Sequence, residues 1–334
     1  MFKKIACLTD IHFGLKSNST THNTDCEEFV DWFIETAQKE GCETGICLGD
    51  WHHHRNNINM LTLQSSLRSL EKLGKAFDTF YFFPGNHDLY YKDKRDVHSI
   101  EWAKHIPGIS VVTEIKTIGN TTLVPWLVGD EWKKMEKLKS KYVFGHFELP
   151  QFYMNAMVQM PDHGELQATH FTAPEYVFSG HFHKRQQTGK IHYIGNAFPH
   201  NFADAWDNER GMMVLEQGSN PQYFNWNNAP SYKTTTLSNL IDNADTIATP
   251  KSYLRVAIDI PITFEEASFI KETFMSQYKI RELTLIPEKK DSESNSDAEI
   301  EQFDSIDTIV TTQIKSIQSE SFDPKVLLAI YNGL

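Results

Sequence analysis

Residue types that can bind metal or phosphate recur at the ends of short apolar runs in this sequence. The runs occupy residues 3–8, 44–48, 80–83, 142–144 and 176–179. The polar residues that follow them are Asp10 and His12, Asp50, Asn86 and His87, His146, and His181 and His183. Carboxylate, imidazole and amide oxygen together suit divalent first-row metals such as Mn, Fe and Zn. The recurrence, rather than any single histidine, predicts a metal centre.

One aspartate in this set is a candidate to serve two metal ions. A single aspartate can bridge two ions about 3.5 to 4 Å apart, a spacing at which a metal pair binds both the attacking and the leaving oxygen of a phosphoryl transfer. Asp50 is the candidate bridge. His52, His53 and His54 follow it directly, but neighbouring side chains in a loop point in different directions. We therefore expect Asp50, and not the histidine triplet, to carry the chemistry.

Buried strands are the elements that must position these residues. Continuous runs of Ile, Val, Phe and Tyr are typical of strands that are covered on both faces. Between the first two runs, Phe29, Trp32, Phe33 and Ala37 recur at helical spacing, and residues 24–27 match a capping box. In open α/β sheets, ligands bind where the carboxyl ends of the strands converge. The sequence thus predicts an α/β fold with the polar groups gathered at one edge.

Composition restricts the class of protein further. The chain has 334 residues, 40% of them hydrophobic, which is enough for one sizeable core and a smaller domain. Its net charge of -12 has the wrong sign for a general nucleic-acid-binding surface. No apolar run approaches the roughly 20 residues of a membrane helix, and the first run is too short for a signal peptide. We expect a cytoplasmic protein without a membrane partner, whose four cysteines are reduced structural thiols.

The blocks D-x-H, GD, GNHD, GH and GHxH, in this order, resemble the calcineurin-like metallophosphoesterase family. The resemblance implies a β-sandwich flanked by helices and a centre of two divalent metal ions. We expect Mn²⁺, with Mg²⁺, Fe²⁺ and Zn²⁺ as alternatives. The blocks imply that one ion is held by Asp10, His12, Asp50 and His183, and the other by Asp50, Asn86, His146 and His181.

The same resemblance assigns roles to residues beside the predicted ligands. His87 matches the family's non-ligand histidine, which stabilises charge on the phosphate or protonates the leaving oxygen. His53 stands where the nuclease branch of the family often has a phosphate-contacting histidine, although residues 51–53 depart from the usual pattern. Lys92 and Arg95 follow GNHD and are predicted to contact the substrate. The alternative is that this basic strip is a solvated loop.

The remainder of the chain indicates a branch of the family. Protein phosphatases of this family carry GDxVDRG and GNHE, whereas this chain has GDWHHHR and GNHD. Residues 190–216 resemble a segment of SbcD-type DNA repair nucleases, but Asn196, Phe198 and Arg210 in it also fit as ordinary turn and strand-start residues. Residues 252–287 predict strand, helix and strand, with Thr263 as the helix N-cap. This pattern resembles the small capping domain of the same nucleases.

The predicted domains are a nuclease domain (1–230), a capping domain (231–287), a flexible acidic linker (288–302) and a helical tail (303–334). The linker is too polar to form a core. The tail carries an apolar stripe at helical spacing that includes Ile306 and Val310. The resemblance implies that this stripe binds an SbcC-type SMC-like ATPase, and the alternative is that the tail docks on its own capping domain.

The function implied by the resemblance is that of a metal-dependent DNA nuclease. It would act as a double-strand exonuclease and single-strand endonuclease in recombination and repair, like bacteriophage recombination endonuclease subunits, in a bacterial cell. The resemblance implies that a helix with Met60, Leu63, Leu67 and Leu70 on one face pairs two copies of the chain, so we expect a homodimer. The alternative is that this face packs in the core. The alternative enzyme is a phosphatase or phosphodiesterase acting on a protein or a small phosphate ester. A non-catalytic adaptor is disfavoured because every ligand block is intact.

Overall fold

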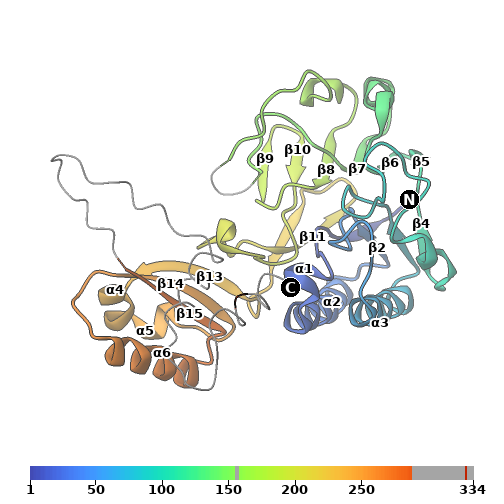
Figure 1. Cartoon of the computed structure of the whole chain (residues 1–334). Coiled ribbons are helices and arrows are strands. Elements are labelled where there is room, and N and C mark those ends of the chain that lie inside the picture. The colour runs from blue at the N-terminus through green and yellow to red at the C-terminus, as the bar shows by residue number, and fades with distance from the viewer. Residues whose placement is uncertain (155–157, 288–327, 329–334) are drawn as a thin grey trace. The chain divides into compact units, whose positions relative to one another are not determined.

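The structure is a computed structural model that describes residues 1–154, 158–287 and 328. The described part contains two six-stranded sheets and one three-stranded sheet (Figure 1). The first sheet has the order β12-β11-β1-β2-β3-β4, with bounds β1 (Lys4–Leu8), β2 (Thr44–Cys47), β3 (Thr79–Phe82), β4 (Ile109–Val111), β11 (Gly211–Glu216) and β12 (Gln222–Asn225). The second has the order β5-β6-β7-β8-β10-β9, with bounds β5 (Lys116–Ile118), β6 (Thr121–Val124), β7 (Tyr142–His146), β8 (Tyr176–Gly180), β9 (Gln186–Thr188) and β10 (Ile191–Tyr193).

The predicted β-sandwich is confirmed, and its core explains the continuous apolar runs. All five runs form strands: β1, β2 and β3 lie parallel in the first sheet, and β7 and β8 lie parallel in the second. Alternate residues of β1 face two different cores. Ala6 and Leu8 pack with the helices outside the first sheet, whereas Ile5 and Cys7 pack between the sheets in a cluster that includes Phe144 of β7. Because both faces are covered, these strands show no polar alternation.

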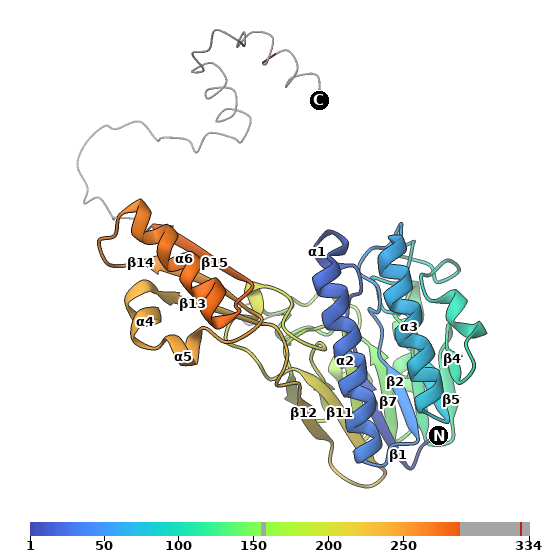
Figure 2. The same cartoon turned by 90° about the horizontal axis from the view of Figure 1, so that it is seen from below.

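Helices cover the outer face of the first sheet. The long helices α2 (Thr20–Lys39) and α3 (Met60–Ala76) lie side by side there, after the short turn α1 (Leu15–Asn18) (Figures 1 and 2). The predicted capping box at residues 24–27 is wrong, because α2 begins one turn earlier and its N-cap is Ser19. No helix of the described part is both long and apolar enough to cross a membrane.

The remaining helices are short, except for one. The 3-10 helices are η1 (Glu101–His105), η2 (Gly129–Lys137), η3 (Ala168–His170) and η4 (Phe202–Asp204), and the last α-helices are α4 (Leu237–Asp242), α5 (Ala244–Ile247) and α6 (Phe264–Tyr278). The four cysteines are buried and unpaired, as predicted.

The predicted strand, helix and strand near the C-terminus are confirmed as β14 (Ser252–Ile258), α6 and β15 (Glu282–Pro287), to which β13 (Ser231–Thr236) adds a third parallel strand. Thr263 caps α6, as predicted, and its partner Glu266 completes a capping box. These elements share an apolar cluster of their own. Residues 1–288 nevertheless form one contact unit, so the boundary at residue 230 stays a prediction. The predicted linker lies outside the described residues, as does the predicted tail apart from residue 328.

Candidate metal centre

The predicted ligands lie where the parallel strands end, and the two strand sets bring them together. Asp10 and His12 follow β1, Asp50 follows β2, Asn86 follows β3, His146 ends β7, and His181 and His183 follow β8. Of the four groups of side chains in the described residues whose ligand atoms lie within 4.8 Å of one another, two consist only of predicted ligands: Asp10, His12 and Asp50 form the first, and Asp50, His146 and His181 form the second. Asp50 belongs to both groups, which is the arrangement expected of a bridging carboxylate. Metal ligation by these residues stays a prediction.

The backbone at these positions is held in an unusual conformation. Asp10, His12, Asp50 and His181 have φ angles of 51°, 53°, 54° and 87°, in the left-handed region that non-glycine residues rarely adopt. Hydrogen bonds between loops hold two of them: Asp10 N–H donates to the Gly49 carbonyl at 3.0 Å, and His12 N–H donates to the Asp50 carbonyl at 3.1 Å. Such conformations persist where the surroundings over-determine them, and they cluster at functional sites.

Electrostatics at the first group fit a bound cation. The Asp10 and Asp50 carboxylates are both buried, and the His12 Nε2 atom lies 3.7 Å from Asp50 Oδ2 with no hydrogen-bond partner in the described part of the chain. Burial alone would raise the pKa of Asp50, but His146 holds it well below its ordinary value. For His146, burial opposes the charged form, yet Asp50 at 3.4 Å raises its pKa to about 9. Buried carboxylates in this site thus require a positive partner, and divalent ions would supply it.

The second group presents its nitrogen atoms in a defined way. The His146 Nδ1–H donates to the Leu48 carbonyl at 2.7 Å, so the ring directs Nε2 towards the Asn86 Oδ1 atom, 3.0 Å away. His181 lies with Nδ1 3.0 Å from the same oxygen and Nε2 3.1 Å from the Glu148 carboxylate. A carboxylate behind a histidine is the usual way to orient a metal-ligating imidazole. Glu148 therefore belongs to the site, although the sequence patterns did not identify it.

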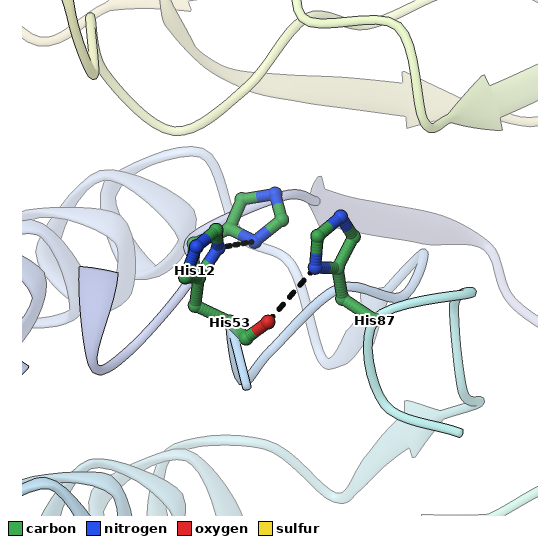
Figure 3. A group of neighbouring side chains, drawn as sticks. All are labelled: His12, His53 and His87. Carbon is green, nitrogen blue, oxygen red and sulfur yellow. Dashed lines mark hydrogen bonds between the residues drawn. The ribbon is translucent and has the colours of Figure 1, made fainter. Parts of the chain in front are cut away.

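His53 and His87 lie against His12 at the edge of the first group (Figure 3). The His87 Nδ1–H donates to the carbonyl oxygen of His53 at 2.8 Å, and the two rings stack with centroids 5.2 Å apart. Burial, followed by the effect of His87, lowers the pKa of His53 to about 4, so this ring is neutral at pH 7. His12, His53 and His87 are also close enough to hold an ion. The non-ligand role of His87 therefore stays a prediction that metal binding must test.

Asp88 connects the loops that carry Asp50 and Asn86. Its buried carboxylate accepts backbone N–H groups from Trp51, His52 and Gly85. Burial and the charge of Asp50 raise its pKa to about 6. The motif GNHD contains this residue, but nothing in the sequence indicates that its partners come from the loop after β2.

The histidine triplet after Asp50 does not act as a unit. His52 is buried, and its Nδ1 and Nε2 atoms lie 2.9 Å from the hydroxyl oxygens of Ser99 and Ser66. His54 has a buried Nε2 without a hydrogen-bond partner in the described residues. Of the three, His53 alone falls within a potential metal-binding group of the described part. The expectation that Asp50, and not the triplet, carries the chemistry stays a prediction.

The two predicted substrate-contacting residues differ in their surroundings. Lys92 is exposed. The Arg95 guanidinium donates to the carbonyl oxygens of Thr113 at 2.8 Å and Trp126 at 2.7 Å and to the Glu131 carboxylate at 2.9 Å. Any contact of Arg95 with a substrate would compete with these bonds, so a substrate role stays a prediction for both residues.

A cavity of about 100 Å³ adjoins the second group. His146 forms part of its wall, together with Trp126, Trp132 and Glu148. The Trp126 ring centroid lies 5.8 Å from that of His146 and 5.1 Å from that of His181. An aromatic surface thus stands directly beside the predicted metal ligands.

The chain is similar to a family model, to a named phage protein and to solved structures. A family model described as calcineurin-like phosphoesterase matches residues 3–185. Exonuclease subunit 1 of Enterobacteria phage T4 is 23% identical over 325 residues, which cover 94% of this chain and 93% of that protein. Among solved structures, the phosphoesterase YfcE from E. coli is 14% identical, with a TM-score of 0.33, over 64% of this chain and 88% of that one. The nuclease MPE from Pseudomonas putida is 19% identical, with a TM-score of 0.28, over 56% of this chain and 66% of that one.

Proposed function

Because the chain belongs to the calcineurin-like phosphoesterase family, we propose that it is a metal-dependent nuclease that hydrolyses the phosphodiester bonds of DNA. The observation that carries the proposal is the sharing of Asp50 by two groups of potential ligands. Similarity to a phage exonuclease subunit over nearly the whole chain supports DNA as the substrate. It also supports a phage-encoded protein that acts in the bacterial cytoplasm. The proposed activities are double-strand exonuclease and single-strand endonuclease, used in recombination and repair.

The proposed centre holds a pair of Mn²⁺ ions, with Mg²⁺, Fe²⁺ and Zn²⁺ as alternatives. Bound divalent ions lower the pKa of water and offset the negative charge of the phosphate. The protein side chains position the phosphate and exchange protons with it. His87 has its Nδ1–H committed to the His53 carbonyl, so its Nε2 is the atom that would exchange a proton with the leaving oxygen. His53, neutral and stacked on His87, would orient that ring and contact the phosphate.

The rival function is hydrolysis of a phosphoprotein or a small phosphate ester on the same scaffold. The aromatic cavity beside His146 favours DNA, because an indole face such as that of Trp126 can stack with a nucleobase next to the reacting phosphate. The test is cleavage of linear duplex DNA and of p-nitrophenyl phosphate by the same preparation, with and without Mn²⁺. We expect Mn²⁺-dependent DNA cleavage as the main activity. Rapid hydrolysis of the ester without DNA cleavage would establish the rival function.

A second copy of the chain is a proposed partner through α3. Met60 and Leu61 at the start of α3 are 79% and 57% exposed, so core packing does not account for them, whereas Leu70 of the same helix is buried. Pairing of two copies would cover these side chains. Light scattering of the purified protein should give a dimer, and Met60→Ser with Leu61→Ser should give a monomer. Phe269→Ser, at a position 69% exposed on α6, is the control and should stay dimeric.

The proposed ATPase partner binds through residues 303–334. The support for this interaction is the apolar stripe of the sequence beyond a polar linker, together with similarity to a protein named as one subunit of an exonuclease. Deletion of residues 300–334 should abolish co-purification with an SMC-like ATPase and leave Mn²⁺-dependent DNA cleavage intact. Serine at Ile306, Val310 and Ile314 should have the same effect. Loss of cleavage in the truncated protein would instead assign the tail to the core fold.

A further inference from the structure

A histidine that none of the sequence blocks contains lies against the first group of predicted ligands. His200 follows β10 and is 1% exposed. Its ring centroid is 5.4 Å from that of His12 and 5.3 Å from that of His183. Ligand atoms of the three side chains lie within 4.8 Å of one another. His200 therefore contributes a third imidazole at a position where the proposed ligand set has two.

The hydrogen bonding of the His200 ring is incomplete in the described part of the chain. Nδ1 and Nε2 are both buried without a hydrogen bond to any described residue. Two other buried histidines are hydrogen-bonded: His22 Nε2 lies 3.0 Å from the His12 carbonyl, and both nitrogens of His52 lie 2.9 Å from serine hydroxyls. Buried polar atoms are nearly always paired, so an unpaired imidazole beside two predicted metal ligands indicates a ligand of its own.

The position of His200 is fixed by its neighbours and not by hydrogen bonds of its ring. Its backbone N–H donates to the Asp204 carboxylate at 2.9 Å, and Asp204 is itself paired with the buried Arg210. The rings of Phe198 and His22 pack edge-on against the imidazole, with centroids 5.1 Å and 5.5 Å away. The side chain is thus preorganised for coordination, which reduces the entropy lost when a ligand is bound.

We propose that His200 is a further metal-binding residue for the ion assigned to Asp10, His12, Asp50 and His183. This inference rests on the proposed ligand set and deepens it. Imidazole nitrogen suits Mn²⁺, Fe²⁺ and Zn²⁺, whereas Mg²⁺ prefers oxygen ligands and retains its waters. An added neutral imidazole therefore makes this position selective for the transition metals over Mg²⁺.

The test is the affinity of the full-length protein for Mn²⁺ and Mg²⁺, measured by electron paramagnetic resonance of free Mn²⁺ with Mg²⁺ as competitor. His200→Phe keeps a planar ring and removes both nitrogens. This variant should bind one of the two Mn²⁺ ions with an affinity roughly 10- to 100-fold lower, the size of effect seen when residues that support a metal site are changed. Its preference for Mn²⁺ over Mg²⁺ should fall by a similar factor, while the other ion is unaffected.

A matched control is His192→Phe. His192 is also buried, but its ring lies against Phe178 and its Nδ1 is 3.1 Å from the Tyr223 hydroxyl, away from the predicted ligands. Both Mn²⁺ affinities should be unchanged in this variant. Unchanged affinity and selectivity in His200→Phe would overturn the role of His200 and leave the proposed nuclease standing. A wild-type protein that binds no Mn²⁺ would overturn both.

A measurement on the wild-type protein covers the case in which His200→Phe does not fold. In Zn²⁺-loaded protein labelled with ¹⁵N-histidine, metal-bound imidazole nitrogens are distinguished by their chemical shifts. The spectrum should show one more zinc-bound histidine than the proposed ligand set supplies. A number equal to that set would contradict the assignment of His200, whatever the activity of the protein.

Discussion

The Nδ1–H group of His87 donates a hydrogen bond to the carbonyl oxygen of His53 at 2.8 Å. A carbonyl oxygen can only accept, so this bond fixes the proton on Nδ1 and leaves Nε2 as the nitrogen that can exchange protons. The backbone N–H of His87 donates to Asp50 Oδ1 at 2.8 Å, which links the backbone of His87 to the proposed bridging carboxylate. The hydrogen bond to the His53 carbonyl thus leaves Nε2 as the atom of His87 that can act on a substrate.

His87→Ser should abolish most of the catalysis and retain the metal ions. Proton transfer or charge stabilisation by such a residue contributes about 10²- to 10⁴-fold in rate, and kcat for DNA cleavage should fall by this amount. Calorimetric titration with Mn²⁺ should still give the wild-type stoichiometry. If one ion is lost, His87 is a ligand with His12 and His53, and its proposed role is wrong.

Asp88→Asn should destabilise the loops on both sides of the centre. The Asp88 carboxylate accepts three backbone N–H groups and the Ser99 hydroxyl, so an amide N–H₂ at this position would face donors and lose at least one bond. Breaking a buried hydrogen bond of this kind costs about 1–3 kcal/mol. Urea unfolding in EDTA should show this loss, whereas the exposed Asp96→Asn should not. Equal stability of the two variants would show that Asp88 is not the connecting residue.

Trp126→Ala should weaken the binding of DNA because the base beside the cleaved bond loses its stacking partner. Stacking of one base on an aromatic side chain is worth about 1–3 kcal/mol, or roughly 5- to 150-fold in KM. DNA with an abasic nucleotide at the cleaved position should bind wild type and variant equally, because no base is present to stack. A loss of the same size on abasic DNA would show that the indole supports the fold and does not receive a base.

The stability of the metal-free protein should depend on pH through His52. Burial lowers the pKa of its ring to about 3, while the unfolded chain takes up the proton near pH 6.5. The neutral ring therefore contributes its full stabilisation above pH 6.5, and this contribution declines as the pH falls from 6.5 towards 3. His52→Gln should flatten the plot of unfolding free energy against pH in this window. If the dependence of the unfolding free energy on pH is the same in His52→Gln as in wild type, a group other than His52 causes it.

Local sequence patterns predicted the strands and the cap of α6, because a residue and its near neighbours determine these features. The runs before Asp10 and Asp50 are strands because both of their faces are buried, and Thr263 caps α6 through Glu266, three residues away. The start of α2 was missed because residues 24–27 also match a capping box, and the competing cap at Ser19 lies outside that window.

The missed parts of the candidate site depend on contacts between distant segments. Asp88 meets donors from the loop after β2, Glu148 meets His181, and His200 meets His12 and His183. Asp88 and Glu148 stand a few residues after apolar runs, beside predicted ligands, and His200 stands in none of the blocks. Spacing along the chain does not indicate which distant residues each of them contacts. Their partners become apparent only when the two sheets are assembled.

The most direct test of the central claim is Mn²⁺ binding and DNA cleavage by Asp50→Asn, measured on one preparation beside wild type. Wild type should bind two Mn²⁺ ions per chain and cleave linear duplex DNA. The variant should remain folded by circular dichroism, bind both ions more weakly and show no cleavage, because one carboxylate serves both positions. Asp93→Asn, an exposed position, should behave as wild type. Near wild-type cleavage by Asp50→Asn would contradict the two-metal account.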